Sequence, residues 1–183
     1  GWEMPRSSRA GVPHGVTLAG MHDVVVGADG IRGGWVWVAV SSLGLACGVD
    51  STARDLHDRF SHVQWLSIDV PIGLPERVPR RCDREARALL GAPRSSSVFS
   101  APVRAVLAAS QYDEASELHR RADGRSMSVQ SFHLLPKIRE VDVLVREGDR
   151  GARHRWREVH PEVSFALWNG GRAMAHAKRT PSG

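Results

Sequence analysis

Two apolar runs on either side of a glycine-rich turn form the clearest hydrophobic pattern in the chain. Residues 24–26 lead without polar interruption toward Asp29, and residues 35–40 follow the glycines. In the second run both alternating sets of side chains are apolar, which is typical of strands that are covered on both faces. The sequence therefore predicts two buried strands in a hairpin, with Asp29 at a strand end, where open α/β sheets bind ligands.

The next elements place a second aspartate near the first. The pattern predicts a short strand over residues 43–49, a helix over residues 53–60 and a strand over residues 63–69, which ends on Asp69. A right-handed crossover through the helix makes this strand parallel to the first strand of the hairpin. We therefore expect Asp29 and Asp69 on adjacent strands at the same end of the sheet. Carboxylates about 5 Å apart repel one another unless a cation lies between them.

The second half of the chain is expected to be mostly helical. Three helices are predicted from apolar periodicity and from the residues that stop them: residues 82–90, 112–122 and 126–146. Pro136 is expected to bend or divide the last of these. A short strand over residues 155–159 then precedes a helix that has Pro161 in its first turn.

Length and composition favour one folded domain. The chain has 183 residues, of which 42% are hydrophobic, which is enough for one sizeable core. Residues 1–20 are rich in Gly, Pro, Ser and Arg and show no periodicity, so we interpret them as a disordered leader or a non-native remnant. The single domain is expected over residues 21–183.

Charge and cysteine content restrict the class of protein only loosely. The formal net charge of +5 permits an anionic partner such as nucleic acid. Two cysteines are too few for a disulfide framework, and the sequence shows neither a signal peptide nor an apolar stretch of about 20 residues. We therefore expect a cytoplasmic protein without a membrane partner. Its oligomeric state stays open.

Three acidic residues are candidates for a metal site. Asp29 and Asp69 end predicted strands, and Glu162 lies at the start of the last predicted helix. Carboxylate oxygens suit a hard cation such as Mg²⁺ or Mn²⁺. Two such ions about 4 Å apart can activate water and stabilise the leaving oxygen in phosphodiester hydrolysis. The structural alternative for each acid is a turn residue or a helix cap.

Other polar residues carry weaker hypotheses. His160 is either a ligand or proton shuttle, or a buried histidine that is hydrogen-bonded. Lys137 and Glu140 have the spacing of an ordinary surface pair on a helix, which competes with a role in a site. Ser96 and Ser97 lack the Gly-x-Ser-x-Gly turn of a nucleophilic serine, so capping or phosphate binding is the better hypothesis.

Six motifs in a fixed order resemble a known family. They comprise Gly-Ala-Asp-Gly-x-Arg-Gly-Gly-Trp at residues 27–35, Ser-Ile-Asp-Val-Pro-Ile-Gly-Leu-Pro at 67–75, Arg-Cys-Asp-x-x-Ala-Arg at 81–87, Ser-Ser-Val-Phe at 96–99, Lys-Ile-x-Glu-Val-Asp at 137–142 and Glu-Val-His-Pro-Glu-Val-Ser-Phe at 158–165. Together they resemble the bacterial and archaeal domain-of-unknown-function family of predicted nucleases with a ribonuclease H-like fold. The resemblance covers about residues 24–180.

The resemblance implies both a fold and an activity. The fold is a three-layer α/β/α arrangement around a mixed five-stranded sheet of order 3-2-1-4-5, with strand 2 antiparallel. The activity is metal-dependent cleavage of a phosphodiester by a two-metal mechanism, with nucleic acid or a small phosphate ester as the substrate. Asp29 and Asp69 would then be catalytic metal ligands, and Glu162 a third ligand or a base that orients water. Phosphate contacts are expected from four basic residues: Arg32, Arg84, Arg87 and Lys137.

Family members usually continue into an acidic helix that would supply the last ligand, so the domain is expected to be truncated at its C-terminus and its nuclease site to be incomplete.

Two other functions stay open at this point. An actin-like or sugar-kinase-like phosphotransferase would use residues 29–34 as a phosphate loop, but such enzymes normally need a second domain. The third hypothesis is a non-catalytic module that binds nucleic acid or protein.

Overall fold

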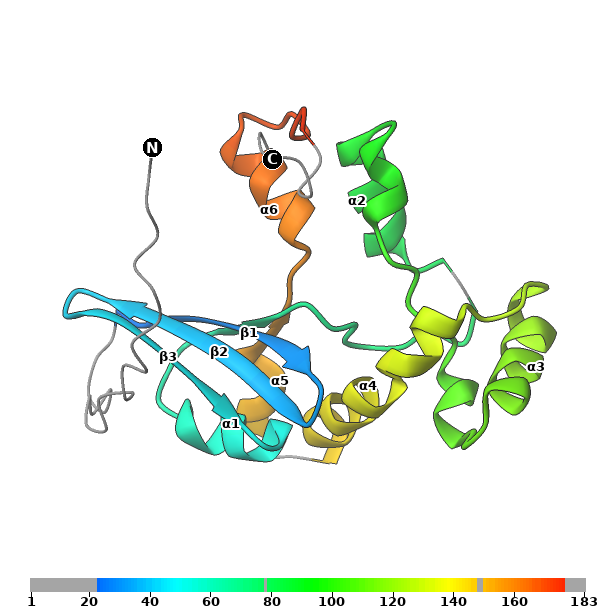
Figure 1. Cartoon of the computed structure of the whole chain (residues 1–183), viewed down its shortest axis with the longest axis horizontal. Coiled ribbons are helices and arrows are strands. Elements are labelled where there is room, and N and C mark those ends of the chain that lie inside the picture. Colours follow the sequence, from blue (N-terminus) through cyan, green and yellow to red (C-terminus); the bar gives the residue numbers. More distant parts are fainter. Residues whose placement is uncertain (1–22, 78, 148–149, 177–183) are drawn as a thin grey trace, which may run out of the picture.

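The described part of the chain folds around one five-stranded sheet (Figure 1). The structure, a computed structural model, describes residues 23–77, 79–147 and 150–176. The predicted leader at residues 1–20 lies outside these ranges. The strands are β1 (Val25–Ile31), β2 (Gly34–Ser41), β3 (Gly44–Asp50), β4 (Leu66–Ile68) and β5 (Trp156–Glu158).

The order of the strands confirms the predicted topology. Hydrogen-bonded neighbours follow the order β3-β2-β1-β4-β5. β2 pairs antiparallel with β1 and β3, whereas β4 pairs parallel with β1 and β5. The crossover from the hairpin to β4 therefore has the direction that the strand-helix-strand pattern predicts.

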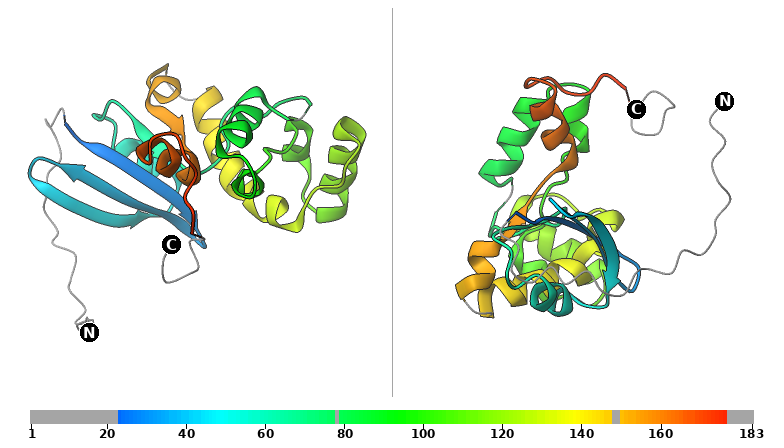
Figure 2. Two further views of the ribbon diagram at one scale, coloured as in Figure 1. Left: turned by 90° about the horizontal axis from the view of Figure 1, so that it is seen from above. Right: turned by 90° about the vertical axis from the view of Figure 1, so that its left-hand side faces the viewer.

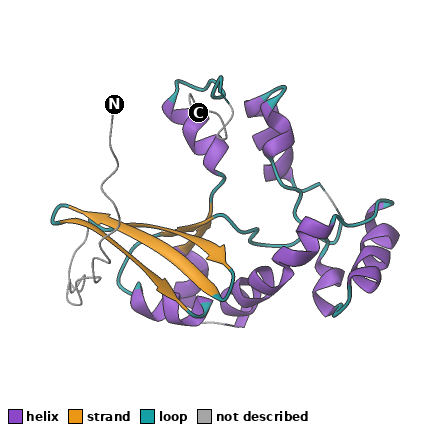
Figure 3. Ribbon diagram, viewed as in Figure 1, coloured by secondary structure: helices purple, strands orange, loops and turns teal. Residues whose placement is uncertain are grey.

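Helices lie on both sides of this sheet, which makes an α/β three-layer fold (Figures 2 and 3). The described helices are α1 (Ala53–Arg59), α2 (Arg81–Leu90), α3 (Tyr112–Asp123), α4 (Val129–Glu147), α5 (Arg150–Arg155) and α6 (Pro161–Trp168), with the 3-10 turns η1 (Arg94–Ser97) and η2 (Arg104–Ala108). α1, α4 and α5 lie on one side of the sheet, and α2 and α6 on the other (Figure 1).

Local sequence signals explain where several helices begin and end. Thr52 and Asp55 form a capping box at the start of α1, in which each side chain accepts a hydrogen bond from the other residue's backbone. Gly124 ends α3 with a left-handed backbone, at a φ of 77° that glycine adopts without strain. α4 continues through Pro136 as one helix, so the predicted division does not occur.

The core lies between the sheet and the layer of α1 and α4. Val26, Trp35 and Ile68 point into it and have no exposed surface. A second, smaller apolar cluster joins α2, η1 and α6 around Leu90 and Ala166. The site described below lies where this smaller helical unit meets the ends of β4 and β5.

The opposite face of the hairpin strands differs from prediction. Both faces were expected to be covered, but Val25 is 69% exposed and the side chains of Val38 and Val40 also face outward. The prediction was wrong because an apolar pattern shows that a face can be covered, but not that a helix lies there. Among the described helices none is long and apolar enough to cross a membrane.

Candidate functional site

Asp29 and Asp69 come to the same end of neighbouring parallel strands. Ala28 is in register with Ile68, and both side chains are buried on the helix-covered face. Asp29 is the next residue of β1, so strand alternation directs its carboxylate to the opposite face. Asp69 is the first residue after β4, and it lines the pocket described next. Asp29 is exposed, and its Oδ1 accepts a hydrogen bond of 2.7 Å from the amide of Gly30.

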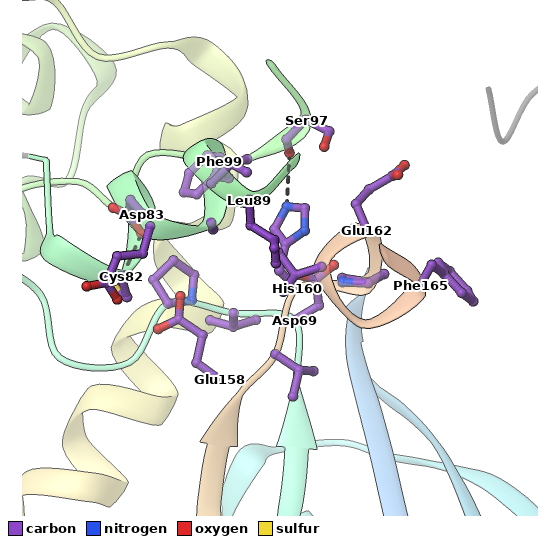
Figure 4. A pocket seen from close by; sticks show the side chains of 18 of the residues that line it. Asp69, Cys82, Asp83, Leu89, Ser97, Phe99, Glu158, His160, Glu162 and Phe165 are labelled. Atoms are coloured by element: carbon purple, nitrogen blue, oxygen red, sulfur yellow. Dashed lines mark hydrogen bonds between the residues drawn. The ribbon is translucent and has the colours of Figure 1, made fainter. Parts of the chain in front are cut away.

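A pocket of about 820 Å³ opens beside Asp69 (Figure 4). Its floor is formed by the chain leaving β4 and β5, and its walls by α2, η1 and α6. The polar lining residues include Asp69, Glu158 and Glu162, together with His160. The pocket therefore joins one of the predicted aspartates to the predicted glutamate.

The side chain of Glu162 does not point toward the aspartates. It is the second residue of α6, and its side chain extends from the start of that helix away from Asp69 (Figure 4). Asp29 does not line the pocket. In the described ranges no three His, Cys, Asp or Glu side chains come together as a metal site. Of the three predicted acids, Asp69 and Glu162 therefore line one pocket, and Asp29 lies outside it at the same end of the sheet.

His160 ties the start of α6 to η1. Its Nε2 lies 3.1 Å from the main-chain oxygen of Ser97. A carbonyl only accepts, so Nε2 donates this bond. Nδ1 is buried and has no hydrogen-bond partner among the described residues. The histidine is therefore hydrogen-bonded, as the structural alternative predicts, but the residue as a whole is only partly buried.

An arginine that the sequence reasoning missed fixes one wall of the pocket. The side chain of Arg80 is only 8% exposed and bonds to Asp83 at 2.7 Å and to Glu158 at 2.6 Å. It also donates to the main-chain oxygen of Ile72, whose amide donates to Glu158. Burial opposes the charge, but these hydrogen bonds raise the pKa of Arg80 above its ordinary value. The network joins β5, the segment after β4 and the start of α2.

The signal for this arginine was partly visible. Arg80 precedes Asp83 by three residues, a spacing that allows contact on one helix face. Its second partner, Glu158, lies 78 residues away, and no local pattern indicates that pair. A sequence rule could thus have found half of the network.

The three predicted arginines occupy different settings. Arg32 is exposed at the end of the β1–β2 hairpin, and Arg84 is exposed on α2. Arg87 is hydrogen-bonded to the segment that follows η1, because it donates to the main-chain oxygen of Val98 and to the hydroxyl of Ser100. Arg32 and Arg84 therefore lie on the surface, and Arg87 holds the loop that follows η1 in the sequence.

Lys137 lies on the helix-covered face of the sheet, where its side chain packs over Gly30, the residue that follows Asp29. Its Nζ is 2.9 Å from Glu140 and 5.0 Å from the ring centroid of Trp35. Glu140 also accepts hydrogen bonds from the indole of Trp35 and from the amide of Ala53 at the start of α1. Its own burial opposes ionisation, but these donors lower the pKa of Glu140. The lysine and glutamate form a structural cluster, and a phosphate contact by Lys137 stays a prediction.

Comparison with models of protein families shows which family the chain belongs to. A family model described as "Protein of unknown function (DUF429)" matches residues 27–183. The chain belongs to this family. Searches of curated proteins and of solved structures returned no match. Membership in the DUF429 family confirms the resemblance as far as the family itself, and it brings no activity with it.

Proposed function

We propose that this member of the DUF429 family is a Mg²⁺-dependent phosphodiester hydrolase that acts at the paired strand ends of β1 and β4. The observation that carries the proposal is the parallel register of Ala28 with Ile68, after which Asp29 and Asp69 follow at the same end of β1 and β4. Two carboxylates at neighbouring strand ends are stable together when a cation offsets their repulsion. The exposed side of the sheet leaves the carboxylate of Asp29 accessible to such a cation.

The donor set fits Mg²⁺ better than it fits a metal enclosed by protein. Mg²⁺ is commonly held by one or two carboxylates, with water and substrate phosphate oxygens as its other ligands. Asp29 and Asp69 would hold it. The bound ion would supply an activated water and offset charge on the phosphoryl oxygens.

The chain's own residues have distinct tasks in this proposal. The amide of Gly30 fixes Asp29 by its hydrogen bond of 2.7 Å. Arg32 and Arg84 are exposed cations on the surface and attract a phosphate backbone. Glu162 lines the same pocket as Asp69 from the start of α6, where a carboxylate can accept a proton from water.

The test is cleavage of labelled single-stranded and double-stranded substrates with Mg²⁺, with Mn²⁺ and with a chelator. We expect Asp29→Asn and Asp69→Asn each to reduce the rate by at least about 100-fold, because each removes a charge that holds the ion. Asp58→Asn is the matched control, since Asp58 is exposed on α1 away from the pair. Cleavage that persists in both variants, or in chelator, would overturn the proposal.

A binding module without catalysis is the second candidate. The observation that favours it is the lack of three assembled ligands in the described part of the chain. This function predicts salt-dependent binding of nucleic acid that Asp29→Asn and Asp69→Asn leave unchanged or strengthen. Binding without cleavage under every divalent ion tested would favour this candidate over hydrolysis.

A further inference from the structure

The pocket beside Asp69 is lined by large apolar side chains that the core does not use. Leu89, Phe165 and Met174 line it and are exposed, and Phe99 lines it while only half-buried. Neither apolar cluster of the described residues includes any of these four side chains. Large apolar groups that converge on a concave surface outside the core mark a binding site.

The charges of the pocket restrict what can enter it. Its described lining contains carboxylates but neither lysine nor arginine. Two of these carboxylates, Asp83 and Glu158, are already paired with Arg80, and Glu85 is paired with Arg81. Glu162 has no ion pair among the described contacts. A phosphate placed inside would meet apolar walls and negative charge, so the pocket favours an uncharged group that donates hydrogen bonds.

We infer that this pocket receives an unpaired nucleobase of a single-stranded nucleic acid. A nucleobase is flat and apolar on its faces, which suits Phe99 and Leu89, and its exocyclic amine can donate to Glu162. Aromatic side chains hold bases in this way with little regard for sequence. The phosphates stay outside the pocket, on the side of the exposed Arg84. The volume of about 820 Å³ is in the range of small-molecule sites and admits a base with room for neighbouring atoms.

The inference rests on the proposed function for the nature of the polymer, and it adds a preference for single strands. A base in a duplex is paired and stacked, so it would have to leave the helix before it entered the pocket. The DUF429 protein should therefore bind a single strand more tightly than a duplex of the same length. The preference should come from the base and not from the phosphates, because the phosphates are present in both.

The experiment measures binding without cleavage. One short DNA strand carries a single 2-aminopurine and is abasic at all its remaining positions. The comparison strand has the same length and is abasic at every position. Both are titrated with the whole chain in chelator, and the fluorescence of 2-aminopurine reports stacking. We expect the strand with the base to bind about tenfold more tightly than the abasic strand and its fluorescence to fall.

Variants locate the base in the pocket. Phe99→Ala should remove most of the tenfold preference, whereas Phe99→Tyr should retain it. Leu89→Trp, which fills the pocket from an exposed position, should also remove it. Trp168→Ser is the control, because Trp168 is exposed on α6 but does not line the pocket. Thermal unfolding of each variant shows that the change in binding is not a loss of fold.

The outcomes separate this inference from the proposed hydrolysis. Equal affinity for the two strands, or a preference that survives both Phe99→Ala and Leu89→Trp, would overturn the nucleobase site. Base-dependent binding that is lost in those variants supports the site even if no divalent ion supports cleavage. Cleavage that depends on Asp29 and Asp69 without any preference for a base would support the hydrolase and overturn the pocket.

Discussion

The two faces of the central sheet place the same kinds of side chain in opposite environments. Val26 is fully buried under α1 and α4, whereas the adjacent Val25 faces outward and is 69% exposed. The carboxylates differ in the same way. Glu140 on the covered face accepts three hydrogen bonds, and Asp29 on the other face is exposed and accepts a hydrogen bond from the amide of Gly30. Carboxylates saturated by protein donors build the fold, and exposed ones remain available for ligands.

The largest expected effect concerns the buried Arg80, and it tests whether this charged residue stabilises the fold. Arg80→Ala removes the guanidinium that pairs with Asp83 and Glu158, and it leaves the buried Asp83 without its cation. We expect a loss of about 3–5 kcal/mol in the free energy of unfolding, as for other broken buried ion pairs. Chemical denaturation followed by circular dichroism measures it.

The neighbouring arginine is the matched control for this prediction. Arg81 is 84% exposed, and its one ion pair among the described residues is with Glu85 on the same helix surface. Arg81→Ala should therefore change the free energy of unfolding by less than about 0.5 kcal/mol. Similar losses in both variants would show that burial of the Arg80 network does not decide its contribution.

The next effect compares two adjacent valines on β1. Val26→Ala removes methyl groups from the packed face and should cost about 2–3 kcal/mol of unfolding free energy, including the cavity that it leaves. Val25→Ala should cost less than about 0.5 kcal/mol, because the side chain is already mostly in water. Equal costs would mean that another layer covers the open face in solution.

The hairpin and the parallel pairing of β1 with β4 were predictable because their signals are local, whereas the full strand order came from the family resemblance. Apolar runs, the caps at Thr52 and Gly124, and the handedness of the crossover each depend on a few neighbouring residues. The position of Asp29 and Asp69 at the same end of neighbouring parallel strands was predictable in the same way. Exposure of Val25 was not predictable, because it depends on where distant helices pack.

The surroundings of the site were predictable only in part. The partners of Arg80 include Glu158, which is 78 residues away, and the pocket forms only when α2 and α6 meet. Short helical spacing indicated the pair of Lys137 and Glu140, but not the indole of Trp35 above which the lysine lies. α5 was missed, since its six residues carry no apolar period. Contacts between distant segments carry the chemistry of this chain, and a single sequence shows them least.

The smallest expected effect concerns the saturated carboxylate of the covered face. Burial works against its charge, but hydrogen bonds from Trp35, Lys137 and Ala53 lower the pKa of Glu140 below its ordinary value of 4.5. A lowered pKa in the folded state adds stability while the pH is above 4.5, and this contribution is lost as the pH falls through the lowered value. Glu140→Gln can still accept from Trp35 and Ala53 but does not titrate.

Denaturation between pH 6 and pH 3 measures this contribution. The native chain should lose about 0.5 kcal/mol more than Glu140→Gln over this range, a modest value because water screens a partly exposed group. Identical acid dependence in the two proteins would contradict the idea that donors on the covered face hold this carboxylate ionised. The contrast with Asp29, which the fold leaves accessible on the open face, would then lose its electrostatic basis.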